Sequence, residues 1–393
     1  MNAIKSTLTV NNLAQIQKGS VEFGDFTLIV GPQASGKSIF LQLLKLILDR
    51  HNISSVLKTN GYDWGKDSKL LLDLYFGETM SGIWKKNTEV RFEDQPYFPS
   101  SFLPKQGVGD RAREEKLFYI PAQRVVSMHQ GWPRNFGSFD IGDPYALKSF
   151  SETIRILIEK ESTKRQDESN KVFPNSRRIK APLRRLLDSS IFFGASVELD
   201  KSSLKKRFVL HVAESKLPFM TWSAGQKEFM PLLLSFYYLM PAAKISTKDN
   251  IKWVVIEEPE MGLHPQAIQS VMVVFLELIA RGYKVVISTH SPVLLELAWA
   301  MNYVKKYSGK PQDLFELFSL PYNQSLKRVF EKVIKEKTFG TYYFKRQKRG
   351  VSIEDISSLD ASSTDLSIAN WGGLSEFASK ASDVVSKLVA NEK

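Results

Sequence analysis

The 393-residue sequence contains no cysteine and only five histidines. The lack of cysteine excludes disulfide bonds, zinc–thiolate sites and thiol catalysis. The histidines do not have the spacing of metal ligands and are scattered along the chain, at His51, His129, His211, His264 and His290. We therefore expect neither a disulfide framework nor a histidine-based metal site.

Long apolar runs are also missing. The richest, Pro231–Ala243, falls short of the roughly 18–20 residues that a membrane-spanning helix needs. The first residues, MNAIKSTLTV, lack the charged and apolar regions of a signal peptide. These features predict a cytoplasmic protein without a membrane partner.

Acidic residues are fewer than basic ones. The chain has 54 lysines and arginines against 42 aspartates and glutamates, which gives a net charge of +12. Such an excess favours an anionic partner such as nucleic acid or a nucleotide, although solvated surface lysines produce the same count. The length allows two or three domains with a large core.

Apolar periodicity predicts alternating strands and helices. Strands are expected over residues 3–10, 21–30, Trp253–Ile256 and Val285–Ser288, and helices over Lys37–Arg50 and Pro265–Arg281. Gly282 ends the second helix. This alternation indicates an α/β fold with a largely parallel central sheet.

A nucleotide motif follows the second predicted strand. The segment GPQASGKS fits the pattern G-x-x-x-x-G-K-[ST] and lies between an apolar strand and a helix. Its amide groups and the helix N-terminus cradle phosphate oxygens, while a lysine reaches the β- and γ-phosphates and a hydroxyl ligates Mg²⁺. We expect ATP and Mg²⁺ to bind at Gly31, Pro32, Gln33, Ala34, Ser35, Gly36, Lys37 and Ser38.

Polar residues follow two other buried strands. In WVVIEEPE a buried strand ends in two acids, Glu257 and Glu258, and in VVISTHSP His290 comes just after another apolar strand. Carboxyl ends of parallel strands lie at the edge of the sheet that carries a phosphate loop. One carboxylate can hold the Mg²⁺ shell, the other can polarise a water, and the imidazole can contact the γ-phosphate.

Five motifs occur in a fixed order between residues 3 and 300: GPQASGKS, YIPAQR, SAGQKE, IEEPEMGLHP and ISTHSP. In this combination the chain resembles the ABC-class ATPases, in the branch of SMC-type repair ATPases, RecF-like proteins and OLD-like ATPases of prokaryotic defence systems. The EPE-x-GLHP form resembles the OLD-like members. The resemblance implies an ABC-type P-loop head with a mixed or parallel central sheet, an antiparallel β-subdomain and a helical insertion.

The resemblance also implies roles for single residues. The turn Ser223, Ala224, Gly225 and Gln226 would close over the γ-phosphate held by a second copy, so that ATP lies between the subunits of a head-to-tail dimer or higher homo-oligomer. Glu257 matches the Mg²⁺-associated acid, for which the family often has aspartate. Glu258 matches the catalytic acid and His290 the switch histidine.

Two further segments match family loops. Gln123 matches the Q-loop glutamine, and Arg124 beside it is a similar candidate. Gly262, Leu263 and His264 match the loop that crosses to the opposite subunit. For His264 an alternative is a helix-capping hydrogen bond ahead of Pro265.

These motifs divide the chain into four parts. Residues 1–144 and 191–300 form the two halves of the ATPase head, 145–190 a helical insertion, and 301–393 a basic C-terminal subdomain. A β-hairpin is expected over residues 192–213. The span between Ser38 and Ser223 is too short for a long coiled coil, which predicts a compact ATPase.

Residues 327–349 are rich in lysine and arginine and contain Tyr342, Tyr343 and Phe344. Two interpretations stay open: a nucleic-acid surface with stacking aromatics, or an edge hairpin with a solvated basic face. A second basic cluster occupies residues 177–185. After residue 300 we find no constellation for a nuclease.

Two functions follow from this pattern. In the first, the protein is an ATP-driven sensor or scaffold that controls a separate effector, a nuclease or toxin, in anti-phage defence. In the second, it is a RecF- or SMC-like repair or recombination ATPase that acts on DNA directly. The OLD-like motif favours the first.

Overall fold

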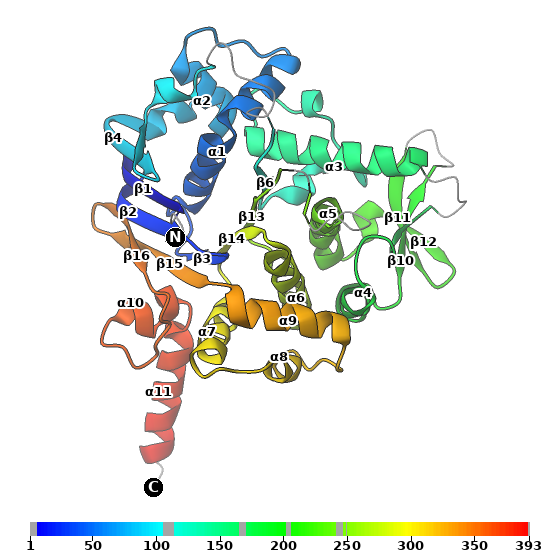
Figure 1. Ribbon diagram of the computed structural model, residues 1–393, viewed down its shortest axis with the longest axis vertical. Helices are drawn as coiled ribbons and strands as arrows, with labels where there is room; N and C mark the ends of the chain where they lie inside the picture. Colours follow the sequence, from blue (N-terminus) through cyan, green and yellow to red (C-terminus); the bar gives the residue numbers. More distant parts are fainter. Residues whose placement is uncertain are drawn as a thin grey trace.

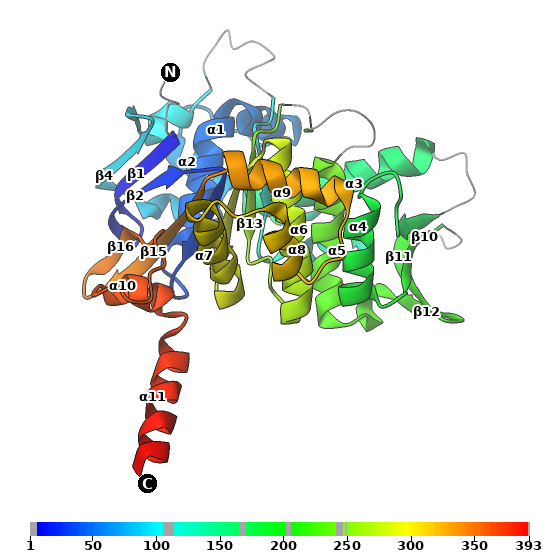
Figure 2. The same ribbon diagram turned by 60° about the horizontal axis from the view of Figure 1, so that its bottom comes forward.

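The computed structural model describes residues 6–104, 114–164, 170–201, 206–240, 247–248 and 250–391. Two layers of helices cover the faces of a large sheet, and a second, smaller sheet lies beside them (Figure 1). The final helix, α11 (Glu376–Asn391), extends away from the body of the molecule in both views (Figure 2).

In the described residues the large sheet has ten strands, in the order β5-β4-β1-β2-β16-β15-β3-β14-β13-β6. Strands β15, β3, β14, β13 and β6 run parallel to one another, whereas β1, β2, β4 and β5 form antiparallel pairs. This arrangement confirms the predicted mixed α/β fold. The strands are β1 (Ser6–Leu13), β2 (Ile16–Phe23), β3 (Phe26–Val30), β4 (Trp84–Phe92), β5 (Gln95–Tyr97), β6 (Leu117–Ile120), β13 (Trp253–Glu257), β14 (Lys284–Thr289), β15 (Phe339–Gln347) and β16 (Gly350–Asp355).

The two faces of the sheet pack into separate hydrophobic cores. Along β13, Val254 and Ile256 point into one core, while Val255 points into the other, because side chains alternate along a strand. Helices α1 (Lys37–Thr59) and α2 (Ser68–Phe76) cover the second face. The first face is covered by α5 (Ala224–Leu239), α6 (Pro265–Arg281), α7 (Pro292–Lys306) and α9 (Gln324–Glu336).

A smaller antiparallel sheet precedes α5. Its described strands have the order β12-β11-β10-β9, with bounds β9 (Lys171–Phe173), β10 (Ser196–Asp200), β11 (Arg207–Val212) and β12 (Ser215–Pro218). Ser196 pairs with His211, so the hairpin expected over 192–213 is present, although residues 202–205 of its turn lie outside the described residues. Helices α3 (Tyr145–Lys164) and α4 (Ala181–Leu187) pack nearby.

Three local predictions differ from the structure. The single strand expected over 21–30 is two strands, because the chain turns at Gly24 and Asp25, and Asp25 accepts hydrogen bonds from Thr338. The helix expected to end at Arg50 continues to Thr59, with non-helical backbone at Asp49. The insertion over 145–190 contains a strand, β9, since Phe173 is buried and stacks on Phe192 at 4.2 Å.

The predicted C-terminal subdomain from residue 301 differs as well. Strand β15 lies within the large sheet and pairs with β3 in parallel, with Tyr343 opposite Val30, and β16 pairs with β2. Residues 339–355 therefore belong to the large sheet and not to a separate subdomain. This part of the chain also contains α8 (Pro311–Leu317) and α10 (Leu366–Ala369).

This placement contradicts the interpretation of residues 342–344 as aromatic residues that stack on nucleic-acid bases. The alternative, a hairpin at the edge of a sheet, is wrong as well, because β15 and β16 lie within the large sheet. Tyr342 and Phe344 are buried in the core that α1 covers, and Phe344 packs edge-on against Phe40 at 5.4 Å. Tyr343 packs against the opposite core. Their rings are therefore not available for stacking on nucleic-acid bases.

Candidate nucleotide site

The phosphate loop connects β3 to α1, and two of its glycines are required by their surroundings. At Gly31, with φ at 149°, a Cβ would come within 2.7 Å of the Phe344 carbonyl oxygen on β15. At Gly36, with φ at 93°, a Cβ would crowd Gln15 and Ile16. The Gln15 side chain also donates to the Ala34 carbonyl at 2.9 Å. The loop is thus held between β15 and the β1–β2 turn.

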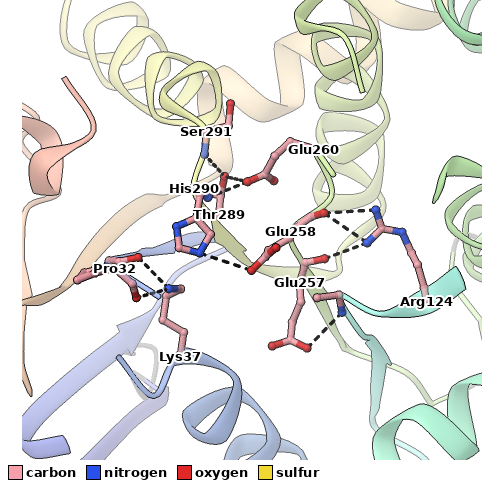
Figure 3. A network of polar contacts seen from close by, with 11 residues as sticks. Pro32, Lys37, Arg124, Glu257, Glu258, Glu260, Thr289, His290 and Ser291 are labelled. Atoms are coloured by element: carbon pink, nitrogen blue, oxygen red, sulfur yellow. Dashed lines mark hydrogen bonds and ion pairs between the residues drawn. The ribbon is translucent and has the colours of Figure 1, made fainter. Parts of the chain in front are cut away.

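Lys37 lies at the start of α1, and its Nζ donates to the carbonyl oxygens of Gly31 at 2.8 Å and Pro32 at 3.0 Å (Figure 3). Burial lowers the pKa of Lys37, and the carboxylates of Glu258, Glu257 and Glu260 oppose that shift. The ammonium group therefore faces the acids that follow β13.

Glu257 is the last residue of β13 and its side chain is buried. Burial raises the pKa of this carboxyl, while hydrogen bonding by Ser38 and by the Ala122 amide, 3.4 Å from Oε2, lowers it. The other oxygen, Oε1, has no hydrogen-bond partner among the described residues. A buried carboxylate oxygen without a partner, beside the Ser38 hydroxyl, fits a hard cation such as Mg²⁺.

In the described residues no group of three histidine, aspartate or glutamate side chains could hold a metal ion. In nucleotide sites Mg²⁺ is typically bound by one or two protein groups, phosphates and waters, and Ser38 with Glu257 would be such a pair.

Glu258 and His290 face each other across the ends of β13 and β14. Glu258 Oε1 lies 3.5 Å from His290 Nε2, and both side chains are about one-third exposed (Figure 3). Glu260 fixes the backbone of the second strand end, since its Oε1 accepts from the Thr289 hydroxyl and the His290 amide, both at 2.7 Å. A carboxylate and an imidazole thus lie at the same edge of the sheet as Lys37.

Arg124 supports the backbone of this site, whereas the sequence suggests it only as a candidate beside Gln123. It follows β6 in the turn η4 (Arg124–Ser127), is fully buried, and donates to the carbonyl oxygens of Glu257 and Glu258. It also contacts Glu228 on α5. Gln123 beside it is exposed.

The turn from Ser223 to Gln226, called the signature turn from here on, forms the N-terminus of α5. The Ser223 hydroxyl accepts from the Gln226 amide and the Gln226 side chain accepts from the Ser223 amide, both at 3.2 Å, which is a capping box. Ser223 and Ala224 are exposed. In the described residues no hydrogen bond or ion pair joins Ser223 to the phosphate loop, and its partner there is Gln226.

The loop after β13 contains the other family segment. A Cβ at Gly225 would lie 2.7 Å from the Gly262 carbonyl oxygen, so the start of α5 packs directly on this loop. His264 caps α6, where its Nδ1 accepts from the Gln266 amide at 3.4 Å, and Pro265 is the first helical residue. The structure therefore shows the predicted cap, and the crossing of this loop to an opposite subunit stays a prediction.

Residues from three segments thus converge at one edge of the sheet: Lys37 and Ser38 from the start of α1, Glu257 and Glu258 from the end of β13, and His290 from the loop after β14. Such a set can hold a triphosphate and orient a water for attack on it. Gln123 is exposed, and its part in the site stays a prediction.

Comparison with known proteins finds related sequences for part of the chain. Residues 129–296 match the family described as "AAA domain, putative AbiEii toxin, Type IV TA system". An 80-residue stretch is 32% identical to the Old nuclease of Escherichia phage P2. These partial matches support the resemblance to ABC-class ATPases of the OLD-like and SMC-like branch. The matched stretch covers 20% of this chain and 14% of the phage protein.

Solved structures similar to this chain include an SMC head bound to the C-winged helix domain of ScpA. The identity is 10%, the match covers 89% of this chain and 96% of that chain, and the TM-score is 0.43. The SMC head domain from Thermotoga maritima has 12% identity, covers 89% and 98%, and has a TM-score of 0.34.

Among the helices of the described residues, none combines the length and the apolar character that crossing a membrane requires.

Proposed function

We propose that this ATPase binds Mg²⁺·ATP between two copies of the chain and hydrolyses it there. The observation that carries the proposal is the division of the site. Lys37, Glu258 and His290 meet at one sheet edge, whereas Ser223 is presented to solvent on the N-terminus of α5. A helix N-terminus binds phosphate through its amides and dipole, so Ser223 is suited to a triphosphate held by another subunit.

Each residue then has a role that its position supports. Lys37 exchanges its bonds to the Gly31 and Pro32 carbonyls for phosphate oxygens, and Ser38 with Glu257 holds the metal ion. Bound there, Mg²⁺ would neutralise phosphate charge. Glu258 orients and deprotonates the attacking water, and His290 donates to the γ-phosphate and links it to Glu258.

We further propose that the ATPase is a sensor or scaffold that controls a separate effector, a nuclease or toxin, in anti-phage defence. The OLD-like motif IEEPEMGLHP and the similarity to the Old nuclease support this role. ATP-dependent joining of two copies would change the surface presented to such an effector.

Dependence on protein concentration tests the site. If two copies form it, specific ATPase activity rises with protein concentration, and Ser223→Arg keeps ATP binding but loses turnover. Ser215→Arg, the same change at an exposed position on β12, serves as the control and keeps full activity. Full activity at all concentrations, or in Ser223→Arg, would refute the shared site.

Direct action on DNA is the second candidate function, and one observation favours it. The two basic clusters of the sequence meet in space, because α4 and α9 both pack against α6 and lie side by side (Figures 1 and 2). Together they line a cavity of about 530 Å³, whose charged residues are Lys180, Glu277, Arg281, Arg328 and Lys332.

The cavity carries surplus positive charge. Glu277, its carboxylate, is buried and pairs with Lys180 and Arg281, both at 2.8 Å. Arg328 and Lys332 are exposed, and no described carboxylate forms an ion pair with either. The cavity has no aromatic lining, which suits the phosphate backbone of a duplex better than stacked single-stranded bases.

Charge reversal tests this surface. Arg328→Glu with Lys332→Glu should weaken duplex DNA binding about 10-fold and lower the slope of log affinity against log salt by about 2. Lys66→Glu with Lys69→Glu, two exposed positions beside α2, is the charge-matched control. Equal weakening by both pairs would refute a specific surface.

A further inference from the structure

Arg124 contacts three parts of the ATPase through one buried guanidinium group. Its Nε donates to the Glu228 carbonyl at 3.0 Å, its Nη1 to the Glu257 carbonyl at 3.2 Å, and both Nη1 and Nη2 donate to the Glu258 carbonyl at 3.3 Å. The Glu228 carboxylate lies 3.7 Å from Nη2. The side chain is fully buried and cannot touch nucleotide directly.

The backbone of Glu258 has an unfavourable conformation that these contacts hold. Its φ is 44°, in the left-handed region that residues with a side chain adopt rarely. Such a residue persists only where its surroundings fix it, and strain of this kind clusters at functional sites. Arg124 binds the carbonyl of Glu258, and the Ser288 carbonyl accepts from its amide at 2.8 Å. Both ends of the residue are fixed, which directs its carboxylate toward His290.

The contact of Arg124 with Glu228 links the backbone at Glu258 to helix α5. Glu228 is on α5, five residues after Ser223. The same helix touches the loop after Glu258 a second time, where a Cβ on Gly225 would meet the Gly262 carbonyl oxygen at 2.7 Å and a Cβ on Gly262 would meet Glu228 Cγ at 3.3 Å. A shift of the N-terminus of α5 is therefore passed to the backbone that holds Glu258.

We propose that Arg124 is a positioning residue with two effects. It holds Glu258 in its working conformation, and it couples the helix that serves the partner's ATP to the glutamate that serves its own. The second effect rests on the proposed shared site, whereas the first concerns a single chain. Contact of Ser223 with one triphosphate would thereby adjust the catalytic glutamate at the other.

Arg124→Lys tests the first effect, because lysine keeps the charge but its single ammonium group cannot span three carbonyls. Hydrogen–deuterium exchange without nucleotide should show faster exchange of the Glu258 amide. ATP affinity should stay within about 3-fold while kcat falls about 100-fold, the cost of a misplaced catalytic group. Arg134→Lys, a half-buried arginine that stacks on Phe139, is the matched control. Unchanged exchange at Glu258 together with unchanged kcat would overturn the proposal.

Two more variants separate positioning from a general loss of structure. Glu228→Gln removes the carboxylate but leaves Arg124 bonded to the three carbonyls, so kcat should stay within about 3-fold. Gly225→Ala leaves Arg124 in place but breaks the contact with Gly262, so ATP binding is retained and cooperativity between sites falls. If Arg124→Lys does not fold, normal cooperativity in Gly225→Ala would itself overturn the coupling. An ATPase that is fully active as a monomer would refute the shared site, while the exchange result would still decide the role of Arg124.

Discussion

Replacement of Gly31 by alanine should damage the nucleotide site through its contact with β15. The new Cβ would lie 2.7 Å from the Phe344 carbonyl oxygen and 3.0 Å from the Phe344 Cβ. Both atoms belong to a strand held between β16 and β3, so the phosphate loop must move instead. The backbone angle at Gly31, 149°, is unfavourable for alanine as well.

Both effects can be given a size. The backbone conformation costs an alanine about 1–3 kcal/mol, and overpacking against a rigid neighbour costs about 1–3 kcal/mol more. Gly61→Ala provides the control, because its φ of 83° is also positive but a Cβ there meets nothing within 4 Å. That variant should lose only about 1–2 kcal/mol of conformational energy.

Urea unfolding measures the loss of stability, and ATP titration measures the loss of nucleotide affinity. We expect Gly31→Ala to lower the free energy of unfolding by about 2–6 kcal/mol and to weaken ATP binding at least 10-fold, because the loop amides leave their positions. Gly61→Ala should bind ATP normally. Equal stability losses in the two variants, with normal ATP affinity in both, would refute the packing of the loop against β15.

Three other predictions follow from the site and its surroundings. Burial raises the pKa of Glu257, so the folded state favours the protonated carboxyl. The free energy of unfolding therefore falls as pH rises from 4.5 through the pKa of the folded state, because the buried group must then carry a charge. Glu257→Gln should therefore raise the thermal unfolding temperature of the nucleotide-free protein at neutral pH but not below pH 4.5. A stability difference between variant and wild type that does not depend on pH would contradict this. Lys37→Ala should abolish ATP binding, since it removes the ammonium group that faces the phosphates, and isothermal titration with wild-type affinity would refute the motif assignment. Mixing Lys37→Ala with Ser223→Arg should restore one working site per mixed dimer in an ATPase assay. No activity at any ratio, while each variant still folds, would argue against complementary halves.

The sequence was sufficient for the parts of the site that local pattern determines. The phosphate loop, Glu257, Glu258 and His290 follow short buried strands, and parallel pairing brings those strand ends to one edge. The hairpin at 192–213 and helix α6 depend on alternation and periodicity over a few residues, and both were predicted.

Features that depend on distant partners could not be predicted. Strand β15 occupies the sheet position beside β3, more than 300 residues away in the sequence, and nothing in its local pattern names that neighbour. In the sequence Arg124 is flanked by polar and apolar residues, as many surface arginines are. In the structure it is buried and bonded to carbonyl oxygens at the end of β13 and on α5, which its neighbours in the sequence do not indicate. The left-handed backbone at Glu258 likewise depends on contacts made only after folding.

The shared site is tested most directly by the mass of Glu258→Gln in solution. With Mg²⁺ and ATP this variant should bind nucleotide, hydrolyse it poorly and accumulate as a complex of at least two chains, whereas the double variant Glu258→Gln, Ser223→Arg should stay monomeric under the same conditions. A monomeric Glu258→Gln protein saturated with ATP, in a sample whose wild type turns over at full rate, would contradict the account.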